Sequence, residues 1–200
     1  MSPGEAAEER GPFASRLGAL VMLTALFTVN MTSRVILGPL LPSVERDLAI
    51  GHGRAGGLFL LLSLGYCAGL LAAGFVSARL THRTTIALSS GVMAVALLGV
   101  GATTTVRELG AAVVGVGFGA GLYLPSGVAA ITSFVSPGDW GKALAFHEVA
   151  PNLAFTAAPL LAEALLRVTS WRGVMVTLGV ASLAAGALFA VAGRGGRAQG

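Results

Sequence analysis

The chain has 200 residues, of which 54% are hydrophobic and 11% are charged, and its formal net charge is +4. A soluble domain carries about 25% charged residues, so this composition excludes an ordinary soluble domain and favours a membrane protein. No basic cluster with interleaved aromatic side chains accompanies the small positive charge, so we expect no nucleic-acid partner. The single cysteine, Cys67, excludes an intrachain disulfide.

Residues 1–16 are polar and hold three glutamates and two arginines. A secretory signal would have a basic start and an apolar core of about 7–15 residues. Here the following apolar stretch is far longer, and no cleavage site of small residues ends it. We therefore expect a cytoplasmic tail over 1–16 and a retained first span after it.

The first predicted span runs from Leu17 to Val44 and contains Arg34. About 20 apolar residues cross the hydrocarbon core of a bilayer. On insertion scales a mid-membrane arginine costs about 2.5–3.5 kcal/mol, while each Leu, Ile, Phe or Val contributes about 0.3–0.6 kcal/mol. The segment holds thirteen residues of those four types, so it can insert despite the arginine. An intramembrane cation of this kind is a candidate functional residue.

Further apolar stretches follow, and each is long enough to span a membrane. They lack the alternating pattern of strands, so helices with closed backbone hydrogen bonding are the expected structure. The sequence therefore predicts an all-α integral membrane domain over 17–193 with a polar tail over 194–200. Its six transmembrane helices are expected near 17–44, 56–79, 84–106, 109–136, 143–166 and 173–193.

The distribution of lysine and arginine predicts the orientation. A cytoplasmic N-terminus places seven of these residues inside and five outside, and the positive-inside rule favours this arrangement. The inner set is Arg10, Arg16, Arg79, Arg83, Lys142, Arg194 and Arg197, and the outer set is Arg46, Arg54, Arg107, Arg167 and Arg172.

Small residues recur at helical spacing in the second and fourth spans. The second contains Gly65, Gly69 and Ala73, and the fourth contains two interleaved GxxxG pairs between 115 and 121. Such faces let helix backbones approach closely in lipid, so we predict tight helix packing there. Prolines at 39, 42, 125, 151 and 159 interrupt helical hydrogen bonding, and the pattern leaves open whether they make hinges or static kinks.

Arg34 is the leading candidate for a binding residue, and Asn30 lies one helical turn before it on the same face. A guanidinium offers donors in a planar fork that matches carboxylate or phosphate oxygens. The pair could therefore hold an anion in a water-lined cavity. The alternative is a structural bridge from Arg34 to Glu148 or to helix carbonyls.

His147 and Glu148 lie near the start of the fifth span and are candidates for carrying a coupling proton, because histidine titrates near neutral pH. A pair that anchors the helix end is the alternative. Tyr66 and Tyr123 lie mid-span, where each phenol could line a cavity or close a helix contact. The scattered histidines indicate no metal site, and no hydrolytic triad or cofactor motif occurs, so we expect neither a cofactor nor an enzyme.

The link between the second and third spans carries the most specific pattern, Gly74-Phe75-Val76-Ser77-Ala78-Arg79-Leu80-Thr81-His82-Arg83. It resembles the signature loop of the major facilitator superfamily, G-x-x-x-D-R-x-G-R-R, with Gly74, Arg79 and Arg83 matching. Ala78 replaces the acid and Thr81 replaces the second glycine. The exit of the first span, Leu41-Pro42-Ser43-Val44-Glu45-Arg46-Asp47-Leu48, and the later Trp171-Arg172 are also similar to that family.

The resemblance implies one half of a twelve-helix transporter, with two inverted three-helix repeats in the half. It implies alternating access around a mid-membrane site between two halves, so we expect a second six-helix half as partner, from a separate chain or a second copy. Anion-transporting members of the family place arginines in the central cavity. The expected function is therefore proton-coupled transport of an organic or inorganic anion across the inner or plasma membrane. An exporter of amphipathic molecules and a non-transporting subunit or truncated half are the alternatives.

Overall fold

The computed structural model describes residues 13–192, so the predicted tail over 194–200 and most of the one over 1–16 lie outside the described residues. The described part consists of helices joined by short links. In chain order these are α2 (Phe13–Val35), α3 (Leu37–Leu48), α4 (His52–Arg79), α5 (His82–Ala102), α6 (Val106–Phe134), the 3-10 turn η1 (Pro137–Asp139), α7 (Trp140–His147), α8 (Val149–Leu166) and α9 (Trp171–Ala192).

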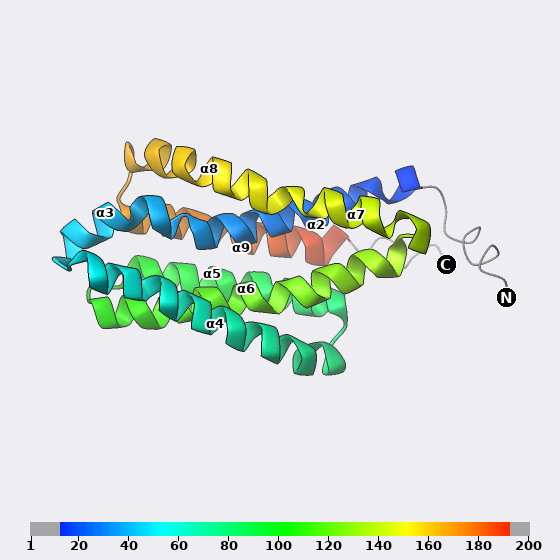
Figure 1. Cartoon of the computed structure of the whole chain (residues 1–200), viewed down its shortest axis with the longest axis horizontal. Coiled ribbons are helices and arrows are strands. Elements are labelled where there is room, and N and C mark those ends of the chain that lie inside the picture. The colour runs from blue at the N-terminus through cyan, green and yellow to red at the C-terminus, as the bar shows by residue number, and fades with distance from the viewer. Residues whose placement is uncertain (1–12, 193–200) are drawn as a thin grey trace.

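Six candidate membrane spans run through this part of the chain, which confirms the predicted all-α membrane fold. They are Arg16–Leu48, His52–Arg79, His82–Ala102, Val106–Phe134, Pro137–Leu166 and Trp171–Ala192. The helices lie roughly along one long axis, with α8 and α4 at opposite edges of the view and α2, α9, α5 and α6 between them (Figure 1). The start of α2 and the end of α9 lie at the same end of this bundle.

Two of the six spans are broken, and each break lies three residues before a proline. The first span changes from α2 to α3 at Ile36, and the fifth changes from α7 to α8 at Glu148. Proline donates no backbone hydrogen bond, and its ring collides with the carbonyl four residues earlier. Pro39 and Pro151 therefore free the carbonyls of Val35 and His147. Both breaks adjoin residues that the sequence marks as functional candidates.

The helices α4 and α6 pack through the predicted small-residue faces. A Cβ added at Gly117 would collide with the Leu62 carbonyl oxygen, and one added at Gly65 would collide with the Val114 carbonyl oxygen. Equivalent collisions would follow at Gly69 and Gly121. The prediction of close packing is confirmed, because only glycine allows the two backbones to approach this closely.

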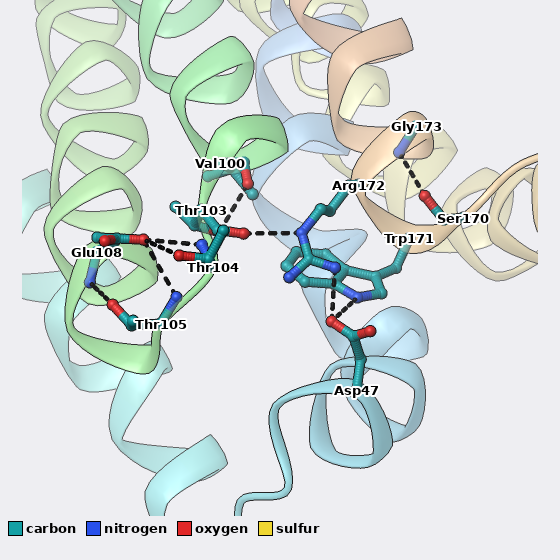
Figure 2. Close-up of polar contacts among 10 residues, drawn as sticks. All are labelled: Asp47, Val100, Thr103, Thr104, Thr105, Glu108, Ser170, Trp171, Arg172 and Gly173. Carbon is teal, nitrogen blue, oxygen red and sulfur yellow. Dashed lines mark hydrogen bonds and ion pairs between the residues drawn. The ribbon is translucent and has the colours of Figure 1, made fainter.

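The end of the bundle opposite the start of α2 is tied by polar contacts (Figure 2). Arg172 at the start of α9 donates to Asp47 Oδ2 of α3 at 2.5 Å and to the Thr103 carbonyl oxygen after α5 at 2.8 Å. The indole nitrogen of Trp171 donates to the same carboxylate oxygen at 3.3 Å. Two motifs that the sequence shows separately, Asp47 and Trp171-Arg172, thus form one contact that fixes α3 against α9.

The start of α6 is fixed at the same end by a capping box (Figure 2). The Thr105 hydroxyl accepts from the Glu108 backbone N–H, and the Glu108 carboxylate accepts from the backbone N–H groups of Thr104 and Thr105. These bonds satisfy N–H groups that a helix start leaves without partners.

Candidate functional site

Arg34 lies in the last turn of α2, directly before the break at Ile36, and faces a cavity of about 410 Å³. The cavity lies between the first span, α4 and α8. Its walls are formed mainly by apolar side chains, with Arg34 and the Ser63 hydroxyl as the polar groups. The lining residues are Met31, Arg34, Val35, Pro39, Phe59, Leu62, Ser63, Phe155, Ala158 and Pro159.

The guanidinium of Arg34 contacts an aromatic ring and a thioether sulfur, and no acidic side chain within the described residues. Its central carbon lies 4.0 Å from the centroid of the Tyr66 ring, and Nη1 lies 3.5 Å from the Met31 sulfur. The Nε atom is buried and has no hydrogen-bond partner. The alternative bridge from Arg34 to Glu148 is not formed, since no ion pair of Arg34 occurs within residues 13–192. The guanidinium therefore has no counter-charge among the described residues.

The other predicted binding residues are divided between two places. Tyr66 contacts Arg34 through its ring face, so it belongs to the cavity region. Asn30 is buried, 6% exposed, and does not line the cavity. Ser63 does line it, and sequence reasoning missed this residue. The sequence does contain a signal for it. Ser63 is a hydroxyl residue between two leucines, and Tyr66 follows one helical turn later on the same face of α4.

Tyr123 lies away from Arg34 and forms a second cluster with His147. The Tyr123 hydroxyl oxygen is 3.1 Å from His147 Nε2 and 2.8 Å from the Leu23 carbonyl oxygen of α2. The His147 ring is fully buried and stacks on Phe27 at a centroid distance of 4.5 Å. The structure therefore places a buried imidazole between α2, α6 and α7.

Glu148 follows this histidine at the break between α7 and α8. Its Oε1 lies 3.7 Å from His147 Nδ1, which is beyond hydrogen-bond reach, and its side chain is 57% exposed. The imidazole is thus the buried member of the pair, and the carboxyl group is the exposed one. The two residues are neighbours in the chain, and their role as proton carriers stays a prediction.

The comparisons with known proteins decide the family. The family model described as Major Facilitator Superfamily matches residues 23–198, which is most of the chain. The chain belongs to the major facilitator superfamily. No curated protein is similar enough in sequence to match significantly. The superfamily and the six candidate spans make the chain an integral membrane protein.

Solved structures of this superfamily share the fold of the chain. Two are crystal structures of a bacterial homolog of the human lysosomal transporter Spinster, both inward-facing. The occupied one has a TM-score of 0.80 at 16% identity and the unoccupied one a TM-score of 0.81 at 18% identity. Each alignment covers 90% of this chain but 44% and 43% of the respective structures, so the chain spans less than half of their length.

The signature loop of the superfamily lies at the end of the bundle where α4 ends and α5 begins. Arg83 Nη2 donates to the carbonyl oxygens of Phe189 at 3.2 Å and Ala190 at 2.8 Å, near the end of α9. A cation there is favourable because helix C-termini carry partial negative charge. Arg79 is exposed, and a Cβ on Gly74 would meet nothing within 4 Å. Arg83 therefore ties the start of α5 to the end of α9 within this chain.

Proposed function

We propose that the chain is the N-terminal six-helix half of a secondary transporter that moves an anion by alternating access. The shared fold and the half-length coverage of the solved relatives support this proposal. The transport path of such proteins lies between two halves. A second six-helix half, encoded separately or supplied by a second copy of this chain, would complete the wall that faces the Arg34 cavity.

The lack of a counter-charge for the Arg34 guanidinium within residues 13–192 carries the assignment of an anion. Removing a cation from water is costly unless a counter-charge or hydrogen bonds replace the water. Within the described residues Arg34 gains only a ring face and a thioether as neighbours. A carboxylate or phosphate group entering the cavity would supply the missing counter-charge, with Ser63 as an additional donor. Asn30, one helical turn before Arg34, is buried and would pack behind the binding site without contacting the anion.

Proton symport through His147 and Glu148 is the proposed coupling. The buried ring and the exposed carboxyl group lie next to each other at the break in the fifth span, so a change in charge there acts on a point where the backbone is interrupted. The other break, beside Arg34, lies in the first span. This span packs against the fifth, since α2 contacts α8. Anion binding and protonation would thus act on neighbouring helices.

We propose an inner or plasma membrane location with the N-terminus in the cytoplasm. Arg16, Arg79, Arg83 and Lys142 lie at the end of the bundle where α2 begins. When the tail residues Arg10, Arg194 and Arg197 of the sequence are counted with them, this side holds seven lysines and arginines against five on the other, and the positive-inside rule favours the cytoplasm for the side with the excess. The Asp47–Arg172 tie would then face the outside.

An exporter of amphipathic molecules is a second candidate, favoured by one observation. Apart from Arg34 and Ser63, the cavity walls are apolar, and Phe59 and Phe155 offer rings to an apolar substrate. A lipophilic cation would be a substrate of such an exporter, but it would meet the positive charge of Arg34.

Thermal stabilisation of the purified protein in detergent distinguishes these two candidates, because a ligand that binds the folded state raises the unfolding temperature. The probes are benzoate, inorganic phosphate and tetraphenylphosphonium, each at several concentrations. We expect at least one anion to stabilise the protein and Arg34→Ala to abolish the effect. Arg107→Ala, which changes an exposed arginine, should leave it intact. Stabilisation by the cation alone, or by anions equally in Arg34→Ala, would contradict the anion assignment.

A further inference from the structure

Three aromatic rings from separate helices pack together inside the bundle. Phe27 of α2 stacks on both of the others, 5.2 Å from the Tyr123 centroid and 4.5 Å from the His147 centroid, and the Tyr123 and His147 centroids lie 6.0 Å apart. The ring planes are nearly parallel, 11° and 6° apart. Both Tyr123 and His147 are fully buried. Because packing holds the imidazole in one orientation, its two nitrogen atoms have separate and defined surroundings.

The first nitrogen, Nε2, faces the hydroxyl group of Tyr123, which has one proton to donate. The hydroxyl oxygen lies 2.8 Å from the Leu23 carbonyl oxygen. A carbonyl can only accept, so the proton must lie between these two oxygens; otherwise their lone pairs would face each other at hydrogen-bond distance. Only lone pairs of the hydroxyl oxygen then remain for His147. Nε2, at 3.1 Å, must therefore carry a hydrogen and donate it.

The second nitrogen, Nδ1, consequently carries a lone pair in the neutral ring. It is buried and has no hydrogen-bond partner. Among the described elements packed around the ring, the ionisable groups in recorded contact with it are the Tyr123 phenol of α6 and the Glu148 carboxyl group before α8. A buried acceptor without a donor is costly, and a proton on Nδ1 would remove that cost and face the carboxylate.

We infer that Tyr123 is a positioning residue that keeps neutral His147 in the Nε2–H tautomer, which leaves Nδ1 as the proton-accepting atom of the coupling step. This inference rests on the proposed proton-coupled transport. In the step, a protonated Glu148 carboxyl group rotates toward Nδ1 to close the 3.7 Å separation. Its O–H bond breaks as the Nδ1–H bond forms, and an imidazolium beside a carboxylate remains. The exposed side of Glu148 takes up the next proton from water.

Nuclear magnetic resonance of the full chain with nitrogen-15-labelled histidine tests this assignment, because the two ring nitrogens report directly which of them is protonated. The chain has three histidines, so His147→Gln identifies the signals of His147. In the neutral form we expect the Nε2–H tautomer for the unmodified protein. Tyr123→Phe, which keeps the ring and removes the hydroxyl, should produce a mixture or the Nδ1–H form. Glu148→Gln should leave the tautomer unchanged.

An Nδ1–H tautomer in the unmodified protein would overturn the inference, and this measurement needs no variant. An unaltered tautomer in Tyr123→Phe, or an altered one in Glu148→Gln, would also overturn it. An unfolding temperature in detergent close to that of the unmodified protein shows that a variant has kept its fold. The tautomer is read without transport, so pH-independent uptake would contradict the proposed coupling and leave the tautomer assignment standing.

Discussion

At the residue scale, the proposed role of Arg34 follows from the groups that surround its guanidinium. The position in an apolar span marks the residue in the sequence, but the sequence also allows a bridge to Glu148. The structure gives Arg34 a ring face, a thioether and an open cavity instead. A cation in this setting has lost water without gaining a counter-charge. Its charge is therefore directed at whatever enters the cavity.

Arg34→Lys tests the guanidinium itself at the residue scale. Lysine keeps the charge but loses the planar fork, the Nε donor and the favourable stacking on Tyr66. A hydrogen bond to a charged group contributes about 1.5–3 kcal/mol. We therefore expect the apparent anion affinity to fall by about 10- to 100-fold, measured by concentration-dependent thermal stabilisation. An affinity equal to that of the unmodified protein would show that charge alone suffices.

The sequence predicts which single residues are candidates, but it does not predict which of them lie together in the structure. Arg34 and His147 stand out because charged or titratable side chains are rare in apolar helices. Spacing along one helix cannot show that Tyr66 faces Arg34 while Tyr123 faces His147, because these contacts join different helices. Asn30 has the helical spacing expected of a partner, yet its side chain is buried and does not line the cavity.

At the element scale, glycines decide how closely α4 and α6 approach. Gly117→Ala should lower the unfolding temperature in detergent, because the added methyl group meets the rigid carbonyl of Leu62. Gly91→Ala is the matched control, since its Cβ would meet nothing within 4 Å and alanine favours a helix. Equal unfolding temperatures for the two variants would contradict the packing described here.

The tie between α3 and α9 gives a second prediction for helices. Asp47→Ala and Arg172→Ala should each lower the unfolding temperature, and the double variant should lose less than the two single losses combined, because both remove one contact. Glu163 of α8 and Arg167 directly after it, an exposed pair four residues apart, serve as the control pair. Their contribution should be small because water screens exposed ion pairs. Additive losses at Asp47 and Arg172 would show that the contact does not couple them.

The helices themselves follow from the sequence, because long uncharged stretches have no other stable form in lipid. The breaks at Ile36 and Glu148 follow from it only in part. Prolines at 39, 42, 125, 151 and 159 all interrupt hydrogen bonding, but Pro42, Pro125 and Pro159 lie inside continuous helices. Neighbouring helices decide which freed carbonyl is tolerated in place, and one sequence does not reveal those neighbours.

At the scale of the whole molecule, the superfamily fold implies a second half. We expect the chain, extracted in mild detergent, to form an assembly with a separate six-helix chain or with a copy of itself. Light scattering combined with size-exclusion chromatography measures the protein mass of that assembly. A strict monomer in both detergent and bilayer would contradict the proposal that two halves enclose the Arg34 cavity and would favour a non-transporting membrane subunit.

Uptake into proteoliposomes that contain the assembled protein tests the central claim most directly. The substrate is the anion that stabilises the purified protein best, and the interior is buffered at a higher pH than the outside. We predict accumulation driven by the pH gradient in the unmodified protein and in Arg107→Ala, and loss of that uptake in Arg34→Ala. Uptake that is unchanged in Arg34→Ala would contradict the assignment of Arg34 as the anion-binding residue.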